Sequence, residues 1–149
     1  MNATMSKFGY PKTLVAEYDH WAVLLRPKQV SLGSLVLASS SEATAFSDLD
    51  EAAFIELGSV IRHVEDTLGA LFGYQKINYL MLMMVDPHVH FHAVPRYAEK
   101  QQWEGLVFID HGWPGPPDLS RANATGPEMN VRLVRRLREH WPRTGPTVA

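Results

Sequence analysis

Three of the seven histidines stand at alternate positions, as His88, His90 and His92. The apolar residues between and after them predict a β-strand over residues 88–94. Alternate side chains of a strand point to the same face. We therefore expect the three imidazoles to line one face of this strand, and the interleaved apolar side chains to pack into the core.

Two kinds of chemistry could use a face of three imidazoles. Histidine is a zinc ligand, but three in-line residues on one strand span about 13 Å, so a metal would need a ligand from another element. A neutral imidazole is also a nucleophile toward phosphorus, and neighbouring histidines can donate to phosphate oxygens. We favour nucleophilic catalysis. Metal binding, or three ordinary histidines on a strand, are the alternatives.

The elements that must position this strand follow from hydrophobic periodicity. Short apolar runs predict strands over residues 12–17, 20–25 and 34–38. Apolar residues at three- and four-residue steps predict a long helix over residues 48–72, with Ser47 as its N-cap and Gly73 after its last turn. A second helix is predicted over residues 127–141.

Residues 76–85 predict a further strand, joined to the histidine strand by a tight turn at Asp86 and Pro87. We expect these two strands to form an antiparallel hairpin, which Pro95 ends. The methionines at 81, 83 and 84 are expected to fill the core. The arrangement of helices and antiparallel strands indicates the α+β class in one domain over residues 1–149.

Composition excludes several classes of protein. With no cysteine there is no disulfide framework, thiolate zinc site or cysteine nucleophile. The longest strongly apolar run, residues 80–85, is far below the about 20 residues that a membrane span needs. We therefore expect a cytoplasmic protein with no membrane partner. The net charge of −2 is too close to neutral to indicate a nucleic-acid partner, and we expect none. Six arginines fall in residues 121–149. This segment could contact RNA or an acidic partner, but we favour the interpretation that it is the solvated face of a helix packed on the acidic remainder of the chain.

The run from His88 to Val94 resembles the His-φ-His-φ-His-φ-φ signature of the histidine triad (HIT) family, and Pro95 with Arg96 matches a common extension of it. The predicted strands, long helix and hairpin also follow the family's order over about residues 15–97. The chain is similar to bacterial HIT proteins related to the diadenosine tetraphosphate hydrolases.

The resemblance implies a five-stranded antiparallel sheet with one long helix and a C-terminal helix, commonly as a homodimer. It implies a hydrolase or nucleotidyl transferase that acts at the α-phosphate of a purine nucleotide derivative. His90 would attack the phosphorus, His92 would contact the α-phosphate or assist the leaving group, and His88 would orient the nucleophile. No metal or other cofactor is implied.

Four further residues are candidates for contacts with the nucleotide. Arg26 and Lys28 fall where relatives bind the ribose, although an Asn or Asp is more usual there. Asn78 could reach phosphate or satisfy a strand end, and Arg96 could neutralise a phosphate or cap its strand. The loop at residues 113–117 could cover the site or pack on a dimer partner.

Departures from the family pattern keep a second function open. Ser34 stands where many members have a fourth histidine, and the following basic stretch is replaced by Ser39, Ser40, Ser41 and Glu42. Fewer donors to phosphate would stabilise the transition state less. The alternative is therefore a nucleotide-binding protein with little turnover. The sequence leaves the substrate open among dinucleoside polyphosphates, phosphoramidates and adenylated amines.

Overall fold

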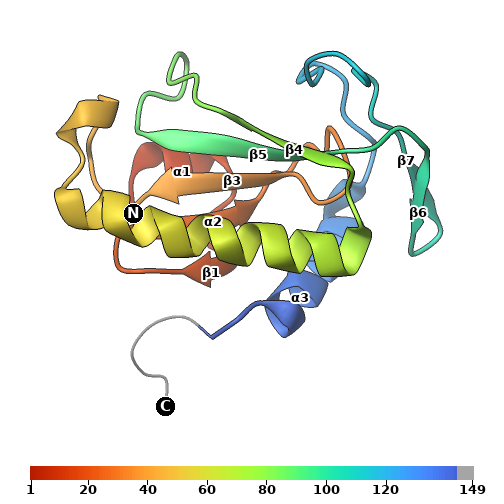
Figure 1. Cartoon of the computed structure of the whole chain (residues 1–149), viewed down its shortest axis with the longest axis horizontal. Coiled ribbons are helices and arrows are strands. Elements are labelled where there is room, and N and C mark those ends of the chain that lie inside the picture. The colour runs from red at the N-terminus through yellow and green to blue at the C-terminus, as the bar shows by residue number, and fades with distance from the viewer. Residues whose placement is uncertain (144–149) are drawn as a thin grey trace.

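A computed structural model describes residues 1–143 of the chain (Figure 1). The last part of the predicted domain, residues 144–149, lies outside the described residues. The elements in chain order are α1 (Ala3–Lys7), β1 (Leu14–Glu17), β2 (Trp21–Leu25), β3 (Leu35–Ser39), a short 3-10 helix (Phe46–Asp48), α2 (Glu51–Phe72), β4 (Lys76–Leu80), β5 (His90–Arg96), β6 (Gln101–Trp103), β7 (Leu106–Phe108) and α3 (Gly126–His140).

Five strands form one antiparallel sheet in the order β1-β2-β3-β5-β4. The predicted α+β class, with a five-stranded antiparallel sheet, one long helix and a C-terminal helix, is confirmed. β6 and β7 form a separate small hairpin. Within residues 1–143 no helix is both long enough and apolar enough to span a membrane.

The sheet has a helix on each face. In Figure 1, α2 runs across the near face and α1 lies behind β3 and β5. Val60, Val64 and Leu68 of α2 are fully buried in the main hydrophobic cluster, which also contains Leu133 and Leu137 of α3. A second, smaller cluster on the other face gathers Met5 of α1 against side chains of β2 and β3. Burial of these apolar faces positions the strands.

The long helix begins three residues later than the sequence predicts. Residues 46–48 form the 3-10 turn, and Leu49, extended and buried, separates that turn from α2. The N-cap is therefore Asp50 rather than Ser47. Gly73 ends the helix in the left-handed conformation, with φ of 63°, as predicted.

The predicted tight hairpin before the histidines is wrong. β4 and β5 do pair antiparallel, from Lys76 opposite Arg96 to Leu80 opposite His92, but residues 81–89 form a loop. The loop leaves the sheet because Val89, at its end, pairs with β3 and with the segment after β3. The Val89 N–H donates to the Ala43 carbonyl, and the Val89 carbonyl accepts from the Ser39 N–H.

Proline 95 lies inside β5 instead of ending it. β3 pairs with β5 only as far as Ala93, so beyond that residue β5 has a neighbour on one side only. A proline is tolerated where a strand has a free edge, because its missing N–H is not needed there.

Candidate active site

Strand β5 separates a core side from a cavity side. Val89 and Ala93 are fully buried in the main cluster under α2, as the alternation predicts. His90 and His92 lie on the opposite face, with ring centroids 5.1 Å apart and planes at 77°. Both histidines line a cavity of about 370 Å³. His88 precedes the strand and does not line this cavity.

One ring nitrogen of His90 is held and the other is free to react. Nδ1 lies 2.7 Å from the backbone carbonyl oxygen of His88. A carbonyl oxygen only accepts, so Nδ1 carries the proton and Nε2 carries the lone pair. Among residues 1–143 no side chain or backbone group hydrogen-bonds to Nε2.

The side chain of His88 is fixed at both ring nitrogens. Thr4 Oγ1 lies 2.9 Å from Nδ1, and Glu42 Oε1 lies 3.1 Å from Nε2. Thr4 Oγ1 also accepts from the His88 backbone N–H at 3.3 Å. His88 therefore orients His90 through its backbone carbonyl. The His88 imidazole bonds to α1 through Thr4 and to the loop after β3 through Glu42, and these bonds hold the residue and its carbonyl in place. Glu42, which departs from the family's basic stretch, is one of the two partners.

The N-terminal segment is the part of the site that sequence reasoning missed. Asn2 caps α1 by accepting from Met5 N–H, and its amide donates to the carbonyls of Ser39 and Ser41. The ring of Phe8 lies 5.6 Å from the rings of both His90 and His92. A five-residue helix is too short to show apolar periodicity, so only the asparagine cap could have indicated it.

The loop between β4 and β5 forms the opposite wall of the cavity. Met83 and Met84 line the cavity, and Met84 is 81% exposed. The prediction that the methionines at 81, 83 and 84 fill the core is therefore wrong for Met83 and Met84. Of the three, Met81 packs partly against the core. Met83 and Met84 leave the core because the sheet pairing of β4 stops at Leu80. Lys7 and Asp86 form a 2.9 Å ion pair between the N-terminal segment and this loop.

Arg26 and Lys28 line the same cavity as the two histidines. Arg26 follows β2, donates from Nη1 to the Lys28 carbonyl at 2.6 Å, and places Nε 3.5 Å from Nδ1 of His92. Burial lowers the pKa of His92 to about 4, and the positive charge of Arg26 and the neighbouring His90 add to this effect, with Asp86 opposing it. His92 is therefore neutral at pH 7.

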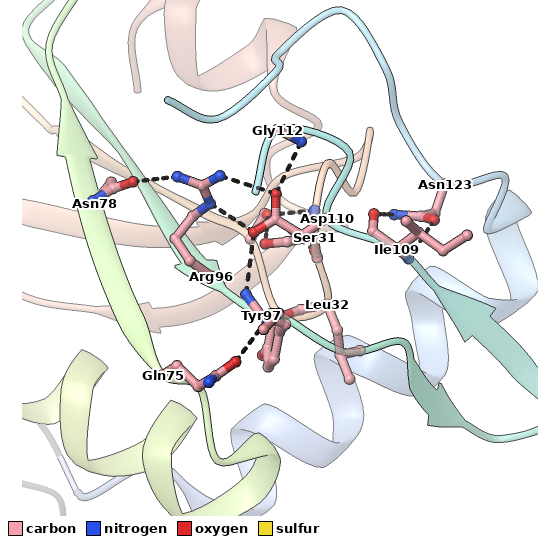
Figure 2. A network of polar contacts seen from close by, with 12 residues as sticks. Ser31, Leu32, Gln75, Asn78, Arg96, Tyr97, Ile109, Asp110, Gly112 and Asn123 are labelled. Carbon is pink, nitrogen blue, oxygen red and sulfur yellow. Dashed lines mark hydrogen bonds and ion pairs between the residues drawn. The ribbon is translucent and has the colours of Figure 1, made fainter. Parts of the chain in front are cut away.

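Arg96 and Asn78 do not line the histidine cavity. Figure 2 shows the polar network in which both side chains take part. The Arg96 guanidinium donates to both carboxylate oxygens of Asp110, at 2.7 and 3.0 Å, and to Asn78 Oδ1 at 2.7 Å. The side chains of Arg96 and Asp110 are only 4% and 3% exposed. These interactions join β4 and β5 to the segment after β7. The structure thus gives Arg96 and Asn78 a place in a buried network, not beside His90.

The remaining sequence candidates also lie apart from the histidines. Residues 113–116 line a separate depression together with Lys76 and Asn78. Ser34 is fully buried, and its hydroxyl accepts from the Ser31 backbone N–H and donates to the Ser31 carbonyl. Within residues 1–143 no group of three or more histidine, aspartate or glutamate side chains is placed to hold one metal ion.

Comparison with known proteins gives a fold but no close relative. No family model matches the chain, and no curated protein matches it. Among solved structures, a histidine triad protein from Bradyrhizobium japonicum is 18% identical, covers 95% of this chain and 96% of its own, and has a TM-score of 0.73. A histidine triad protein from Sinorhizobium meliloti is 18% identical, with 94% and 95% coverage and a TM-score of 0.72. A diadenosine triphosphate hydrolase from Plasmodium falciparum is 13% identical, with 87% and 76% coverage and a TM-score of 0.65.

These likenesses show that the chain has the fold of histidine triad proteins. His90 and His92 lie on β5, which is paired with β3 on one side and with the edge strand β4 on the other.

We predict that Arg96→Met destabilises the fold. Removing one partner of a buried ion pair leaves Asp110 buried and uncompensated, which costs about 3–5 kcal/mol. Urea unfolding measures this loss. Arg132→Met is the control, because its 3.5 Å pair with Glu104 is 44% and 40% exposed and contributes at most about 1 kcal/mol. Near-native stability with weaker nucleotide binding would instead place Arg96 in the binding site.

We predict that His92 stays neutral from pH 7 down to pH 5, and that Arg26→Met raises its pKa toward the ordinary 6.5 because a neighbouring positive charge is lost. Nitrogen-15 NMR of the imidazole rings follows the titration. Lys28→Met is the control, because Lys28 is not among the groups that shift the pKa of His92. A native His92 that titrates between pH 6 and 7 would contradict this description.

Proposed function

We propose that this chain is a HIT-family enzyme that breaks a bond at the α-phosphate of a purine nucleotide derivative through a covalent nucleotidyl-His90. The observation that carries the proposal is the state of His90. Its Nδ1–H donates to the His88 carbonyl at 2.7 Å. The ring lines a cavity that is also lined by the positively charged side chains of Arg26 and Lys28. A neutral imidazole with one nitrogen so anchored presents the other as a nucleophile.

The reaction has two displacements at one phosphorus atom. In the first, Nε2 of His90 forms a bond to the α-phosphorus while the bond to the leaving group breaks and its electron pair departs with that group. As the bond forms, positive charge on the imidazole is stabilised by the His88 carbonyl. In the second, a water oxygen attacks the same phosphorus, the P–N bond breaks, and its electron pair returns to Nε2 as the water loses a proton to solvent.

The neighbouring side chains stabilise the charge that develops on the phosphoryl oxygens. His92 is neutral and, with Nδ1 facing Arg26, carries its proton on Nε2, from which it can donate to a phosphate oxygen. Arg26 and Lys28 line the cavity and supply positive charge. Losing one donor of this kind typically costs about 10²–10³ in rate.

A specific observation favours the second candidate, a nucleotide-binding protein with little turnover. Phe8 packs against the rings of His90 and His92, and His90 is only 1% exposed. The cavity that reaches His90 lies between Phe8 and the loop of residues 82–86. If that path holds the α-phosphate away from Nε2, the site binds without reacting.

A homodimer is part of the same proposal. β4 is an edge strand of the sheet, and among the described strands it pairs only with β5. A free strand edge is a template for pairing with another chain. Native mass spectrometry of the purified protein measures the number of chains: a mass of two chains would support the homodimer, and a mass of one chain would contradict it.

The proposed function predicts a transient nucleotide adduct on His90. Intact-protein mass is measured after mixing with diadenosine tetraphosphate and, separately, adenosine phosphoramidate, while AMP release is followed. We expect one adenylyl group on the native chain and none on His90→Asn. His140→Asn, which changes an exposed histidine at the end of α3, is the matched control and should form the adduct. Nucleotide binding without adduct or AMP would favour the binding protein.

A further inference from the structure

Arg26 is the charged side chain that stands next to a triad histidine inside the cavity. We propose that Arg26 makes this site selective for an anionic leaving group, the phosphate chain of a nucleoside or dinucleoside polyphosphate, and against an amine leaving group. This inference rests on the proposed function and names the substrate class of the same site.

The position of Arg26 determines where His92 can hold a proton. Its Nε lies 3.5 Å from Nδ1 of His92, which is long for a hydrogen bond but close for two charges. The guanidinium is also held in place by its 2.6 Å bond to the Lys28 carbonyl. A second proton on His92 would create an imidazolium beside this cation at a buried position. His92 therefore keeps a single proton, on Nε2, consistent with its lowered pKa.

A neutral His92 can stabilise a phosphate but is a weak acid. When a P–N bond of a phosphoramidate breaks, the nitrogen must receive a proton, because an amide anion is too basic to leave. When a P–O bond of a polyphosphate breaks, the electron pair stays on the bridging oxygen of a phosphate chain, which is a stable anion at neutral pH. General acid catalysis contributes about 10²–10⁴ in rate, so a site without an acid discriminates against the amine.

The charge of the cavity lining favours the same leaving group. Lys7, Arg26 and Lys28 line the cavity, against one carboxylate, Asp86. That carboxylate is paired with Lys7 at 2.9 Å, so Arg26 and Lys28 remain for an anion. The chain as a whole carries a net charge of −2, so the positive lining of the cavity does not reflect the charge of the whole chain. A cleft lined by one sign of charge attracts ligands of the opposite sign.

The experiment compares kcat/KM for diadenosine tetraphosphate and adenosine phosphoramidate, which transfer the same adenylyl group to His90. We expect the native protein to prefer the tetraphosphate at least tenfold, and Arg26→Met to lower this ratio at least tenfold. Arg26→Lys should retain most of the preference because it keeps the charge. Lys76→Met, which removes a cation outside the cavity, should leave the ratio unchanged.

A pH profile separates a selective role of Arg26 from a merely structural one. Because both substrates need the neutral His90 nucleophile, the profile is followed as the ratio of kcat/KM for the phosphoramidate to that for the tetraphosphate. In the native protein this ratio should rise as the pH falls toward 4, where His92 becomes an acid, and the rise should move to higher pH in Arg26→Met.

Two results would overturn the inference while leaving the proposed function intact. One is an adduct that forms at least as efficiently from the phosphoramidate as from the tetraphosphate. The other is an Arg26→Met protein in which both substrates lose activity equally, with no shift in the pH profile. If neither substrate gives an adduct on His90, the proposed function and the inference both fail.

Discussion

The hydrogen bond from His90 Nδ1 to the His88 carbonyl is the interaction on which the site depends. It decides which nitrogen of His90 carries the proton, and so which one faces a substrate. The carbonyl is itself held because His88 is bound at both ring nitrogens, by Thr4 and Glu42, and because the buried Val89 anchors the next residue in the core. A reactive atom is thus positioned by backbone geometry and core packing.

The N-terminal segment and the loop before β5 form walls of the cavity that contains His90 and His92. Phe8 packs on both cavity histidines, and Lys7 bridges to Asp86 across the cavity. Together they bury His90 and His92 on the face that α2 does not cover. Burial lowers the local dielectric, which strengthens the interaction of Arg26 with any charge near His92. The same burial therefore limits the access of a substrate to His90 and strengthens the interactions between charges inside the cavity.

Periodicity and turn chemistry predicted the sheet, the long helix, the C-terminal helix and the two faces of β5, because burial imposes a regular pattern on them. Contacts between distant segments could not be predicted. Nothing in the sequence indicates that Thr4 meets His88, 84 residues away, or that Arg96 pairs with Asp110 in the interior. The apolar pattern predicts a strand and a tight turn where the structure has a loop, because the apolar side chains of residues 82–85 form a cavity wall rather than part of the core.

The most direct test of the covalent route is the stereochemistry at phosphorus. A diadenosine tetraphosphate made chiral at the α-phosphorus with sulfur is hydrolysed in water labelled with heavy oxygen, and the configuration of the released nucleotide is determined. Two successive displacements, at His90 and then by water, each invert the centre. The account therefore predicts overall retention, whereas inversion would show that water attacks directly and that His90 forms no intermediate.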